Sequence, residues 1–157
     1  KDQVMQIEQS FTVNAPRSRV WTLIRDPEQM ITCVPGCDSI EETGPDTYKA
    51  AVVVSVGPIK ARFSMTIKVI EETVMEYVRT ESKGEEGSRA SVVQAISDMR
   101  LTDTPEGGTE IHYSSTVEIS GRLGRYGSGM MKKIATKLAA KFEDSFRTMA
   151  ETQEEVC

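Results

Sequence analysis

The chain has 157 residues, of which 38% are hydrophobic and 27% are charged. A chain of this length is expected to form one domain and to bury roughly 68 to 70% of its unfolded surface. The formal net charge of −5 argues against a general nucleic-acid binder, because phosphate contacts need a concentrated basic surface. The longest apolar run, residues 50–54, is far shorter than the ~20 residues that cross a bilayer. We therefore expect a single domain over 1–157, with its core at about 3–150 and a tail at 151–157, and no nucleic-acid partner.

The first third of the chain predicts one strand and two short helices. Apolar and polar residues alternate from 3 to 13, as in a strand with one buried face. Pro16 ends this strand, and apolar residues then recur at helical spacing until Asp26-Pro27. A second short helical segment is predicted to continue to about Thr32.

Two turn signals, at 34–36 and 44–46, precede a series of strands. From Tyr48 onward apolar residues occupy every second position, most clearly in the segment 59–69. Gly57-Pro58 is a candidate hairpin turn before that segment. Further strands are predicted at 74–80, about 91–101 and 110–120, joined through 84–87 and 105–108. Consecutive strands at this spacing predict an antiparallel meander.

The last part of the chain predicts one long amphipathic helix. If this helix were continuous from Arg122 to Glu151, it would be ~45 Å long and would cross a curved sheet from rim to rim. Glycines at 124, 127 and 129 predict a loose or irregular beginning. Apolar residues recur every four positions along the helix, at Met130, Ile134, Leu138, Phe142 and Phe146.

Basic residues gather on the other side of the same segment. Between Glu118 and Glu143 there is no acidic residue, and the six basic ones are Arg122, Arg125, Lys132, Lys133, Lys137 and Lys141. Such a surface can hold a protein against anionic headgroups or an acidic partner, where each Lys or Arg contributes ~1 kcal/mol. The alternative interpretation is a solvated helix face without a partner.

No set of residues predicts a catalytic or a metal site. His112 is the single histidine, and its place on a polar strand face favours simple exposure over a Ser-His-Asp arrangement, for which no nucleophile motif is present. Cys33 and Cys37 flank a Pro-Gly turn, where packing is favoured over a metal site or a redox pair. Cys157 is expected to be free, and the glycine-rich segment 121–129 matches no nucleotide-binding motif.

The apolar residues indicate a binder more than a catalyst. Eight methionines supply flexible side chains that adapt to shaped ligands, although ordinary core packing is the alternative. A concave sheet closed by one long helix tends to leave a cavity that side chains do not fill. The sequence therefore favours a protein that encloses an apolar molecule.

The order of these elements resembles the helix-grip fold of the START-like (SRPBCC) superfamily. This is an α+β fold in which a curved antiparallel sheet of about seven strands wraps around a long C-terminal helix, with two short helices after the first strand. Over about 5–150, three sets of motifs look like CoxG, a family of carbon monoxide dehydrogenase subunits. These are Ala15-Pro16 with Val20-Trp21 and Asp26-Pro27, then Cys33-Val34-Pro35-Gly36-Cys37, then residues 56–63.

The resemblance implies a non-catalytic accessory protein of a molybdenum-containing dehydrogenase, placed on the inner face of the cytoplasmic membrane. It also implies a pocket for a quinone or a lipid, with no tightly bound cofactor. A cytoplasmic location with peripheral membrane contact is expected, since the N-terminus shows no apolar secretory segment.

The residues expected to carry this function form two sets. The cavity is expected to be lined by Met65, Ile67, Met99, Tyr113, Met130, Ile134 and Leu138, with Met30, Val34 and the segment 124–129 near its mouth. The surface expected to face the membrane or a partner consists of Arg122, Arg125, Lys132, Lys133 and Lys137.

Two other functions stay open at this point. A START-like enzyme of the cyclase or hydrolase type would use the same cavity, with His112 or Tyr113 as its acid–base group. A ligand-free adaptor would instead have a filled core and act through its surface alone. A cavity in the structure favours the carrier or the enzyme over the adaptor.

Overall fold

The computed structural model describes residues 3–56, 58–126 and 128–152. Its strands are β1 (Gln3–Val13), β2 (Cys37–Gly44), β3 (Thr47–Val56), β4 (Ile59–Thr73), β5 (Tyr77–Glu86), β6 (Ser91–Asp103) and β7 (Thr109–Gly121). Its helices are α1 (Arg17–Ile24), α2 (Pro27–Met30) and α3 (Ser128–Glu151), with short 3₁₀ turns η1 (Gly87–Arg89) and η2 (Leu123–Arg125). Cys157 and the tail from 153 onward lie outside the described residues.

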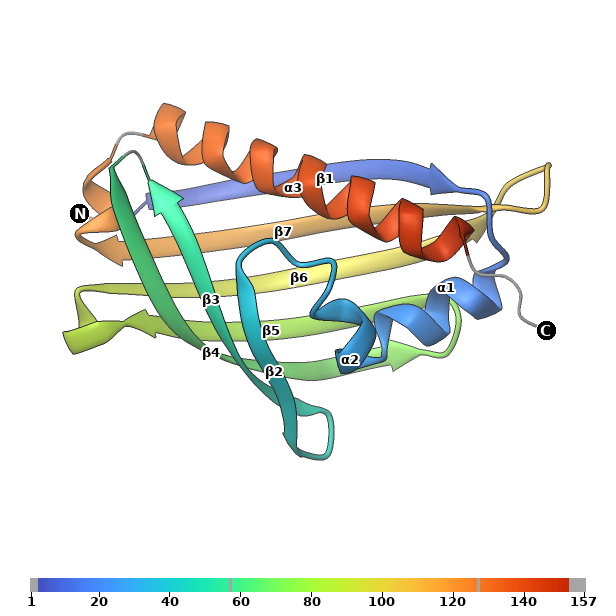
Figure 1. Ribbon diagram of the computed structural model, residues 1–157, viewed down its shortest axis with the longest axis horizontal. Coiled ribbons are helices and arrows are strands. Elements are labelled where there is room, and N and C mark those ends of the chain that lie inside the picture. The colour runs from blue at the N-terminus through green and yellow to red at the C-terminus, as the bar shows by residue number, and fades with distance from the viewer. Residues whose placement is uncertain (1–2, 57, 127, 153–157) are drawn as a thin grey trace.

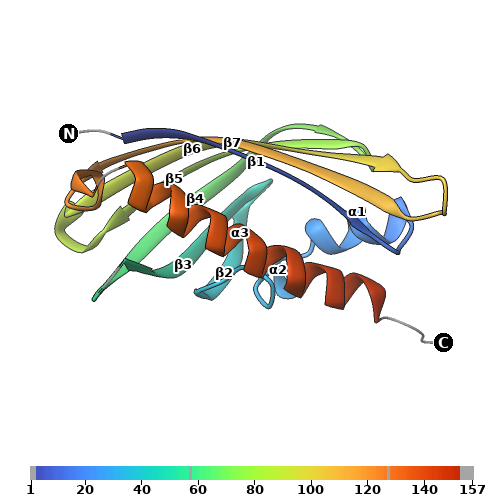
Figure 2. The same cartoon turned by 90° about the horizontal axis from the view of Figure 1, so that it is seen from above.

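The seven strands form one antiparallel sheet in the order β1-β7-β6-β5-β4-β3-β2 (Figure 1). Strands β2 to β7 follow each other as a meander, and β1 pairs with β7 at the far edge. Helix α3 lies across one face of this curved sheet, and α1 and α2 lie toward one end of the same face (Figure 2). This arrangement confirms the predicted sheet, the two short helices after β1 and the long C-terminal helix.

The two short helices begin where their sequence provides suitable termini. Pro16 is the N-cap of α1, and its carbonyl accepts the first helical hydrogen bonds, from the Arg19 and Val20 N–H groups. The Asp26 side chain caps α2 by accepting a hydrogen bond from the Glu28 N–H at 3.0 Å. Pro27 occupies the first position of α2, where a missing N–H costs nothing.

Strand β5 differs from its predicted position. The sequence pattern placed a strand at 74–80 and a connection at 84–87, but β5 begins at Tyr77 and continues to Glu86. Gly84 suggested a loop, yet it lies buried within β5, where a Cβ would collide with the Met65 sulfur. The absence of a side chain at Gly84 lets Met65 of the neighbouring strand pack directly on its backbone, and a larger residue would displace Met65. Strand β2 was not predicted, because its segment is polar and lies at the edge of the sheet.

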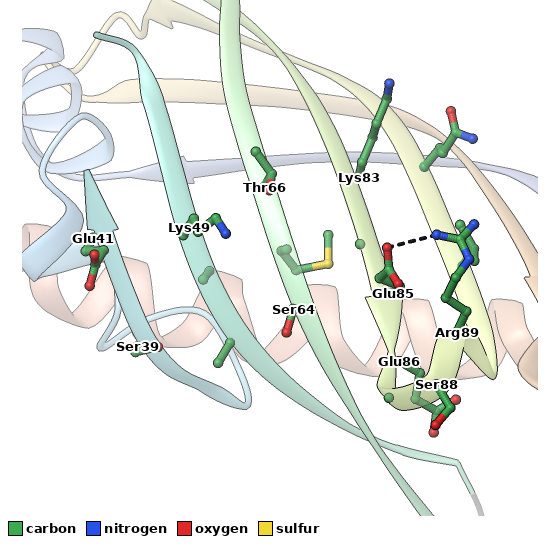
Figure 3. Close-up of a pocket in the computed structure, with 17 residues that line it drawn as sticks. Ser39, Glu41, Lys49, Ser64, Thr66, Lys83, Glu85, Glu86, Ser88 and Arg89 are labelled. Carbon is green, nitrogen blue, oxygen red and sulfur yellow. Dashed lines mark hydrogen bonds and ion pairs between the residues drawn. The ribbon is translucent and has the colours of Figure 1, made fainter. Parts of the chain in front are cut away.

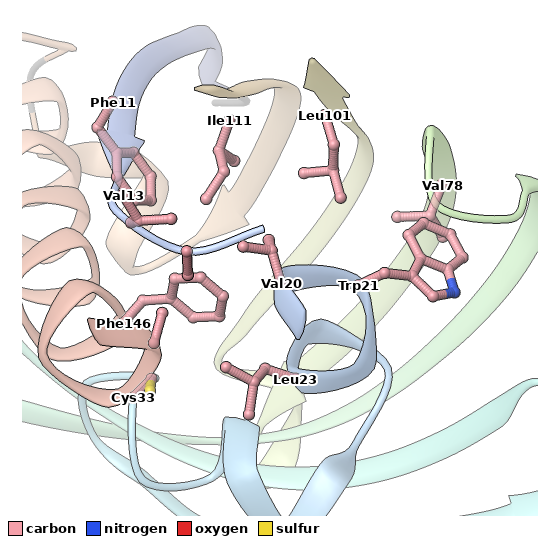
Figure 4. Close-up of a cluster of buried hydrophobic side chains, with 12 residues drawn as sticks. Phe11, Val13, Val20, Trp21, Leu23, Cys33, Val78, Leu101, Ile111 and Phe146 are labelled. Carbon is pink, nitrogen blue, oxygen red and sulfur yellow. The ribbon is translucent and has the colours of Figure 1, made fainter. Parts of the chain in front are cut away.

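The main hydrophobic core lies where α1 and the C-terminal half of α3 meet the ends of β1, β6 and β7 (Figure 4). Val13, Val20 and Phe146 are fully buried there. The Phe11 ring meets the rings of Phe142 and Phe146 edge-on, with centroids 6.4 and 6.5 Å away. This aromatic cluster fixes one end of α3 to the sheet.

The beginning of α3 is irregular, as its glycines predict. A 3₁₀ turn at Leu123–Arg125 is followed by Tyr126 in an extended conformation, and α3 starts at Ser128. Gly127 lies outside the described residues. None of the described helices combines the length and the apolar composition that a bilayer crossing requires.

Truncation of Phe146 is expected to destabilise the fold more than any change on the exposed side of α3. Phe146→Ala leaves a cavity in the main core and should lower the free energy of unfolding by about 3–5 kcal/mol. Lys137→Ala, on the exposed side of the same helix, should change it by less than about 0.5 kcal/mol. Urea denaturation followed by circular dichroism measures both. Equal effects of the two changes would contradict the role given to this core.

Candidate functional site

The space between α3 and the sheet is not filled by side chains. A cavity of about 470 Å³, called here the main cavity, lies between the α3 residues Met131 to Phe142 and the inner face of the sheet. Its described lining is apolar except for Gln9 and Tyr113. Protein interiors rarely contain voids larger than a water molecule, so a cavity of this size is a candidate binding site.

A smaller chamber adjoins the main cavity. It has a volume of about 210 Å³ and lies between α1, α2 and strands β2 to β7; we call it the side chamber. The two spaces share four lining residues, Met30, Val34, Met99 and Tyr113. One elongated molecule can therefore extend from one space into the other.

Most residues that the sequence assigned to the cavity do lie there. The main cavity is lined by seven of them, namely Met30, Val34, Met65, Met99, Tyr113, Ile134 and Leu138. Ile67 lines the side chamber instead. The binding role of these residues stays a prediction, because the structure gives their position and not their ligand.

Met130 lies elsewhere than the sequence pattern suggested. Its side chain is 42% exposed, whereas Met131 is 4% exposed and lines the main cavity. Residues four apart on a helix turn by ~40° at each step, so a series that starts at Phe146 has turned by ~160° at Met130. The strict four-residue spacing therefore leads away from the cavity at the start of α3, and Met131 takes the inward position.

Several lining residues were not named from the sequence. Met5, Phe63 and Val117 line the main cavity from three different strands. Each lies on the apolar face of an alternating segment, so the alternation predicts that its side chain points inward. It does not show which inward residues line the cavity and which are covered by other side chains. Leu123 also lines the cavity and was hidden within the glycine-rich segment.

Arg122 forms an ion pair with Glu86, although 37% of its side chain is exposed. Its Nε lies 3.0 and 3.1 Å from the two carboxylate oxygens of Glu86, whose side chain is 8% exposed. Glu86 also accepts a hydrogen bond from the Ser91 hydroxyl at 2.9 Å, and Ser91 in turn accepts the Leu123 N–H at 3.0 Å. This cluster fixes the segment that leads into α3. Arg125, Lys132, Lys133 and Lys137 remain exposed.

The hydrogen bond from Arg122 lowers the pKa of Glu86 below its ordinary value. The end of β5 brings this carboxylate next to the Arg122 guanidinium group and neutralises it, while the role expected of Arg122 at the surface stays a prediction. The pair links β5 to the beginning of α3 across 36 residues of sequence.

His112 lies on the outer face of the sheet, away from the cavity. Its Nδ1 is 2.6 Å from the Ser10 hydroxyl and its Nε2 is 3.3 Å from a carboxylate oxygen of Glu110. The imidazole side chain is 49% exposed, in agreement with the predicted exposed histidine. It is therefore not placed to act on a molecule inside the fold.

The two described cysteines take part in local packing. Cys33 is buried with its sulfur 3.7 Å from the Met149 sulfur, and the Cys37 thiol donates to the Ser39 carbonyl at 3.4 Å. Burial raises the pKa of both thiols, which makes them less reactive. Within the described part of the chain, no group of three or more His, Cys, Asp or Glu side chains is placed to hold a metal ion.

A larger hollow of about 730 Å³ lies on the face of the sheet opposite α3 (Figure 3). Its side chains are mainly charged or hydroxylic, including Lys49, Thr66 and Lys83, and Glu85 forms an ion pair with Arg89 at 3.0 Å. Exposed groups of this kind are well solvated, and such ion pairs contribute little binding energy. The apolar main cavity is therefore the stronger candidate site.

Glu86→Gln should loosen the segment that leads into α3 in a pH-dependent way. Because the folded-state pKa of Glu86 is lowered, its ionised form stabilises the fold above the ordinary carboxyl pKa of about 4.3, and this stabilisation is lost as the pH falls through the lowered value. The variant should be less stable than the wild type at pH 7, and the difference should shrink below about pH 4.

Urea midpoints at pH 7 and pH 3.5 test this expectation. Glu118→Gln, on the exposed outer face, is the matched control and should leave the midpoint nearly unchanged at both values. A difference between wild type and Glu86→Gln that stays constant with pH would contradict the assigned pairing.

Comparison with known proteins places this geometry in a known fold. A conserved protein from Geobacillus kaustophilus is 23% identical, with 93% of this chain and 95% of that chain covered and a TM-score of 0.86. A START superfamily protein from Mycobacterium smegmatis is 12% identical over 93% and 97% of the two chains, with a TM-score of 0.74. The Zhui aromatase/cyclase from Streptomyces sp. R1128 is 13% identical over 95% and 94%, with a TM-score of 0.70. These likenesses confirm the START-like fold.

The sequence comparisons identify the family. No curated protein matches the sequence. The model of the CoxG family, which is described as a carbon monoxide dehydrogenase subunit, matches residues 10–151, and this is most of the chain. The apolar cavity under the C-terminal helix thus occurs in a chain that belongs to the CoxG family of carbon monoxide dehydrogenase subunits.

Proposed function

We propose that this protein is a non-catalytic accessory protein that binds an apolar ligand, a quinone or a lipid, in the main cavity. It would link a molybdenum-containing dehydrogenase to the membrane; the family name supports an association with a carbon monoxide dehydrogenase. The observation that carries the proposal is the apolar main cavity of about 470 Å³ beneath α3.

The size and the polarity of the cavity favour a ligand over water. At about 30 Å³ per molecule, a space of this size would hold on the order of fifteen waters. Its apolar walls offer few hydrogen-bond partners, so these waters would lose bonds that they make in bulk solvent. An apolar guest releases them, and each CH₂ group that it buries contributes ~0.8 kcal/mol before the entropy of binding is subtracted.

The cavity lining favours binding over acid–base catalysis. The described side chains around the main cavity include no carboxylate, imidazole or amine. Tyr113 is the lining residue with a titratable hydroxyl, and it is the group that an enzyme of the cyclase type would use. The fold shared with an aromatase/cyclase is the observation that keeps this second function open.

The exposed basic residues of the α3 segment support a contact with an anionic surface. Arg125, Lys132, Lys133 and Lys137 are exposed near the N-terminal half of α3, next to the exposed Met130. Lys and Arg near anionic headgroups each contribute ~1 kcal/mol, and an apolar side chain among them can enter the headgroup region. We infer that this end of α3 faces the membrane or an acidic surface of the dehydrogenase.

Filling the main cavity should abolish ligand binding. Ala135 lines the cavity and Ala140, on the same helix, is exposed, so the two positions form a matched pair. Ala135→Trp should weaken binding of the uncharged dye N-phenyl-1-naphthylamine by at least about tenfold, since the indole occupies the space of the guest. Ala140→Trp should leave binding unchanged.

Fluorescence titration measures this effect, and native mass spectrometry of the gently purified protein shows whether a quinone or a lipid accompanies it. Equal dye binding by both variants would contradict the location of the site. A wild-type protein that carries no guest and binds no dye would contradict the carrier function itself and favour the adaptor.

Charge reversal on α3 should release the protein from anionic membranes. Lys132→Glu combined with Lys133→Glu should abolish cosedimentation with phosphatidylglycerol vesicles at low salt, because each reversal replaces attraction by repulsion. Lys49→Glu with Lys83→Glu, on the opposite face of the sheet, is the control with the same net charge. Wild-type binding that is insensitive to salt, or equal loss in both double variants, would argue against the proposed surface.

A further inference from the structure

A row of hydroxyl groups crosses the inner face of the sheet. Thr80, Ser97 and Ser115 lie directly opposite one another on β5, β6 and β7. The Ser97 hydroxyl is 2.9 Å from the Ser115 hydroxyl and 3.4 Å from that of Tyr113. We call these four residues the hydroxyl row. Thr80, Ser97 and Tyr113 line the side chamber, and Tyr113 also lines the main cavity.

The hydroxyl row lies in a mainly apolar floor. On one side Val78 lies opposite Met99, and on the other side Ala95 lies between Ser82 and Val117. A hydroxyl in such surroundings is costly unless it is hydrogen-bonded. Burying these hydroxyls therefore costs more desolvation free energy than burying apolar side chains at the same positions would. A ligand that forms a hydrogen bond with the row would offset this cost.

The row has hydrogen-bonding capacity to spare. Each hydroxyl provides one donor and two acceptor positions. Ser97, Ser115 and Tyr113 thus have three O–H donors, but they share only two contacts with each other in the described part of the chain. At least one O–H is left for an acceptor on a bound molecule. The Tyr113 hydroxyl is the best placed to donate to a ligand, because its contact with Ser97 is long and because Tyr113 lines both spaces.

The charged residues at the side chamber are already neutralised by their neighbours. Arg25 donates to Glu72 at 2.9 Å, to Asp46 at 3.0 Å and to the Tyr48 hydroxyl at 3.2 Å. The Asp98 side chain is engaged outside the chamber by the Tyr77 hydroxyl and, at 3.7 Å, by Arg79. An ionised ligand would therefore enter without a free counter-charge and would lose its hydration.

We propose that the hydroxyl row binds an uncharged oxygen function, such as a ketone or an alcohol, on the head of a ligand whose apolar remainder fills the main cavity. This inference rests on the proposed carrier function and adds the chemical class of the ligand. The head lies in the side chamber, with its oxygen at Tyr113 and Ser97. The apolar part passes between Met30 and Met99, which line both spaces.

Three naphthalene probes of nearly equal size test the inference: 1-acetylnaphthalene, which carries a ketone; 1-ethylnaphthalene, which carries no oxygen; and 1-naphthoate, which is ionised. Each displaces N-phenyl-1-naphthylamine in a fluorescence titration. Tyr113→Phe removes one hydroxyl and keeps the ring, and Ser97→Ala removes the second. Each change should weaken the ketone about five- to tenfold, as expected for one hydrogen bond, and change the hydrocarbon by less than about twofold.

Two comparisons exclude an effect of folding. Ser114→Ala removes a hydroxyl from the opposite face of β7 and should change neither probe. Ser97→Thr keeps a hydroxyl and should retain the preference for the ketone. For the wild type, 1-naphthoate should bind at least about tenfold more weakly than 1-acetylnaphthalene, because the ionised group must be desolvated.

The outcomes separate the two proposals. If the ketone and the hydrocarbon both bind and the variants weaken them equally, the carrier function stands and the role of the hydroxyl row is wrong. Binding of 1-naphthoate as tight as that of the ketone would overturn the uncharged class. If neither naphthalene nor the dye binds the wild type, the carrier function fails and this inference fails with it.

Discussion

Helix α3 is held to the sheet at both ends and, along one side of its middle, by Gln9 of β1, which donates to the Ala139 carbonyl at 3.1 Å; beyond β1 its middle bridges a hollow. At its C-terminal half, Phe142 and Phe146 pack against Phe11 in the main core. At its N-terminal end, the Glu86–Arg122 pair and the buried Leu123 hold the segment that leads into it. A rigid helix fixed at two distant points cannot sink into the concave sheet between them, so the space beneath its middle stays open.

Small residues of the sheet beneath α3 also keep the cavity open. Gly84, Ala95, Ser97 and Ser115 are small residues on the central strands, whereas the positions that surround them carry Met65, Met99 and other long side chains. Large residues at all of these positions would fill the space under α3 and add to the core. The sheet instead gives up some apolar burial, and the methionines at the rim can adjust to the shape of a guest.

Apolar and charged residues lie on different surfaces of the molecule. The inner face of the sheet is mainly apolar, and the hydroxyl row and Gln9 are polar groups beside the cavity. The outer face carries ion pairs and the exposed His112, which are far from anything enclosed by α3. The lysines lie on the solvent side of the helix whose other side roofs the cavity. A guest and an anionic surface would therefore meet opposite sides of one element, which fits a carrier that delivers its ligand at a surface.

Much of this organisation could be read from local patterns in the sequence. The alternation at 3–13 and 59–69 and the four-residue spacing of Ile134, Leu138 and Phe142 gave the element types, because a strand and a helix each repeat with their own period. These patterns also indicated which residues face inward. They did not show that Gly84 continues a strand, since its fit depends on Met65 from the neighbouring strand.

The chain by itself determined the fold, its family and most of the apolar lining, because these follow from periodicity and from motifs that are short in sequence. Tertiary structure alone decided which apolar residues stay uncovered and that Glu86 pairs with Arg122. It also brought the hydroxyls of Thr80, Ser97 and Ser115 into one row. Each of these features depends on how segments that are far apart in the chain pair and pack with one another. A local sequence pattern does not contain that information.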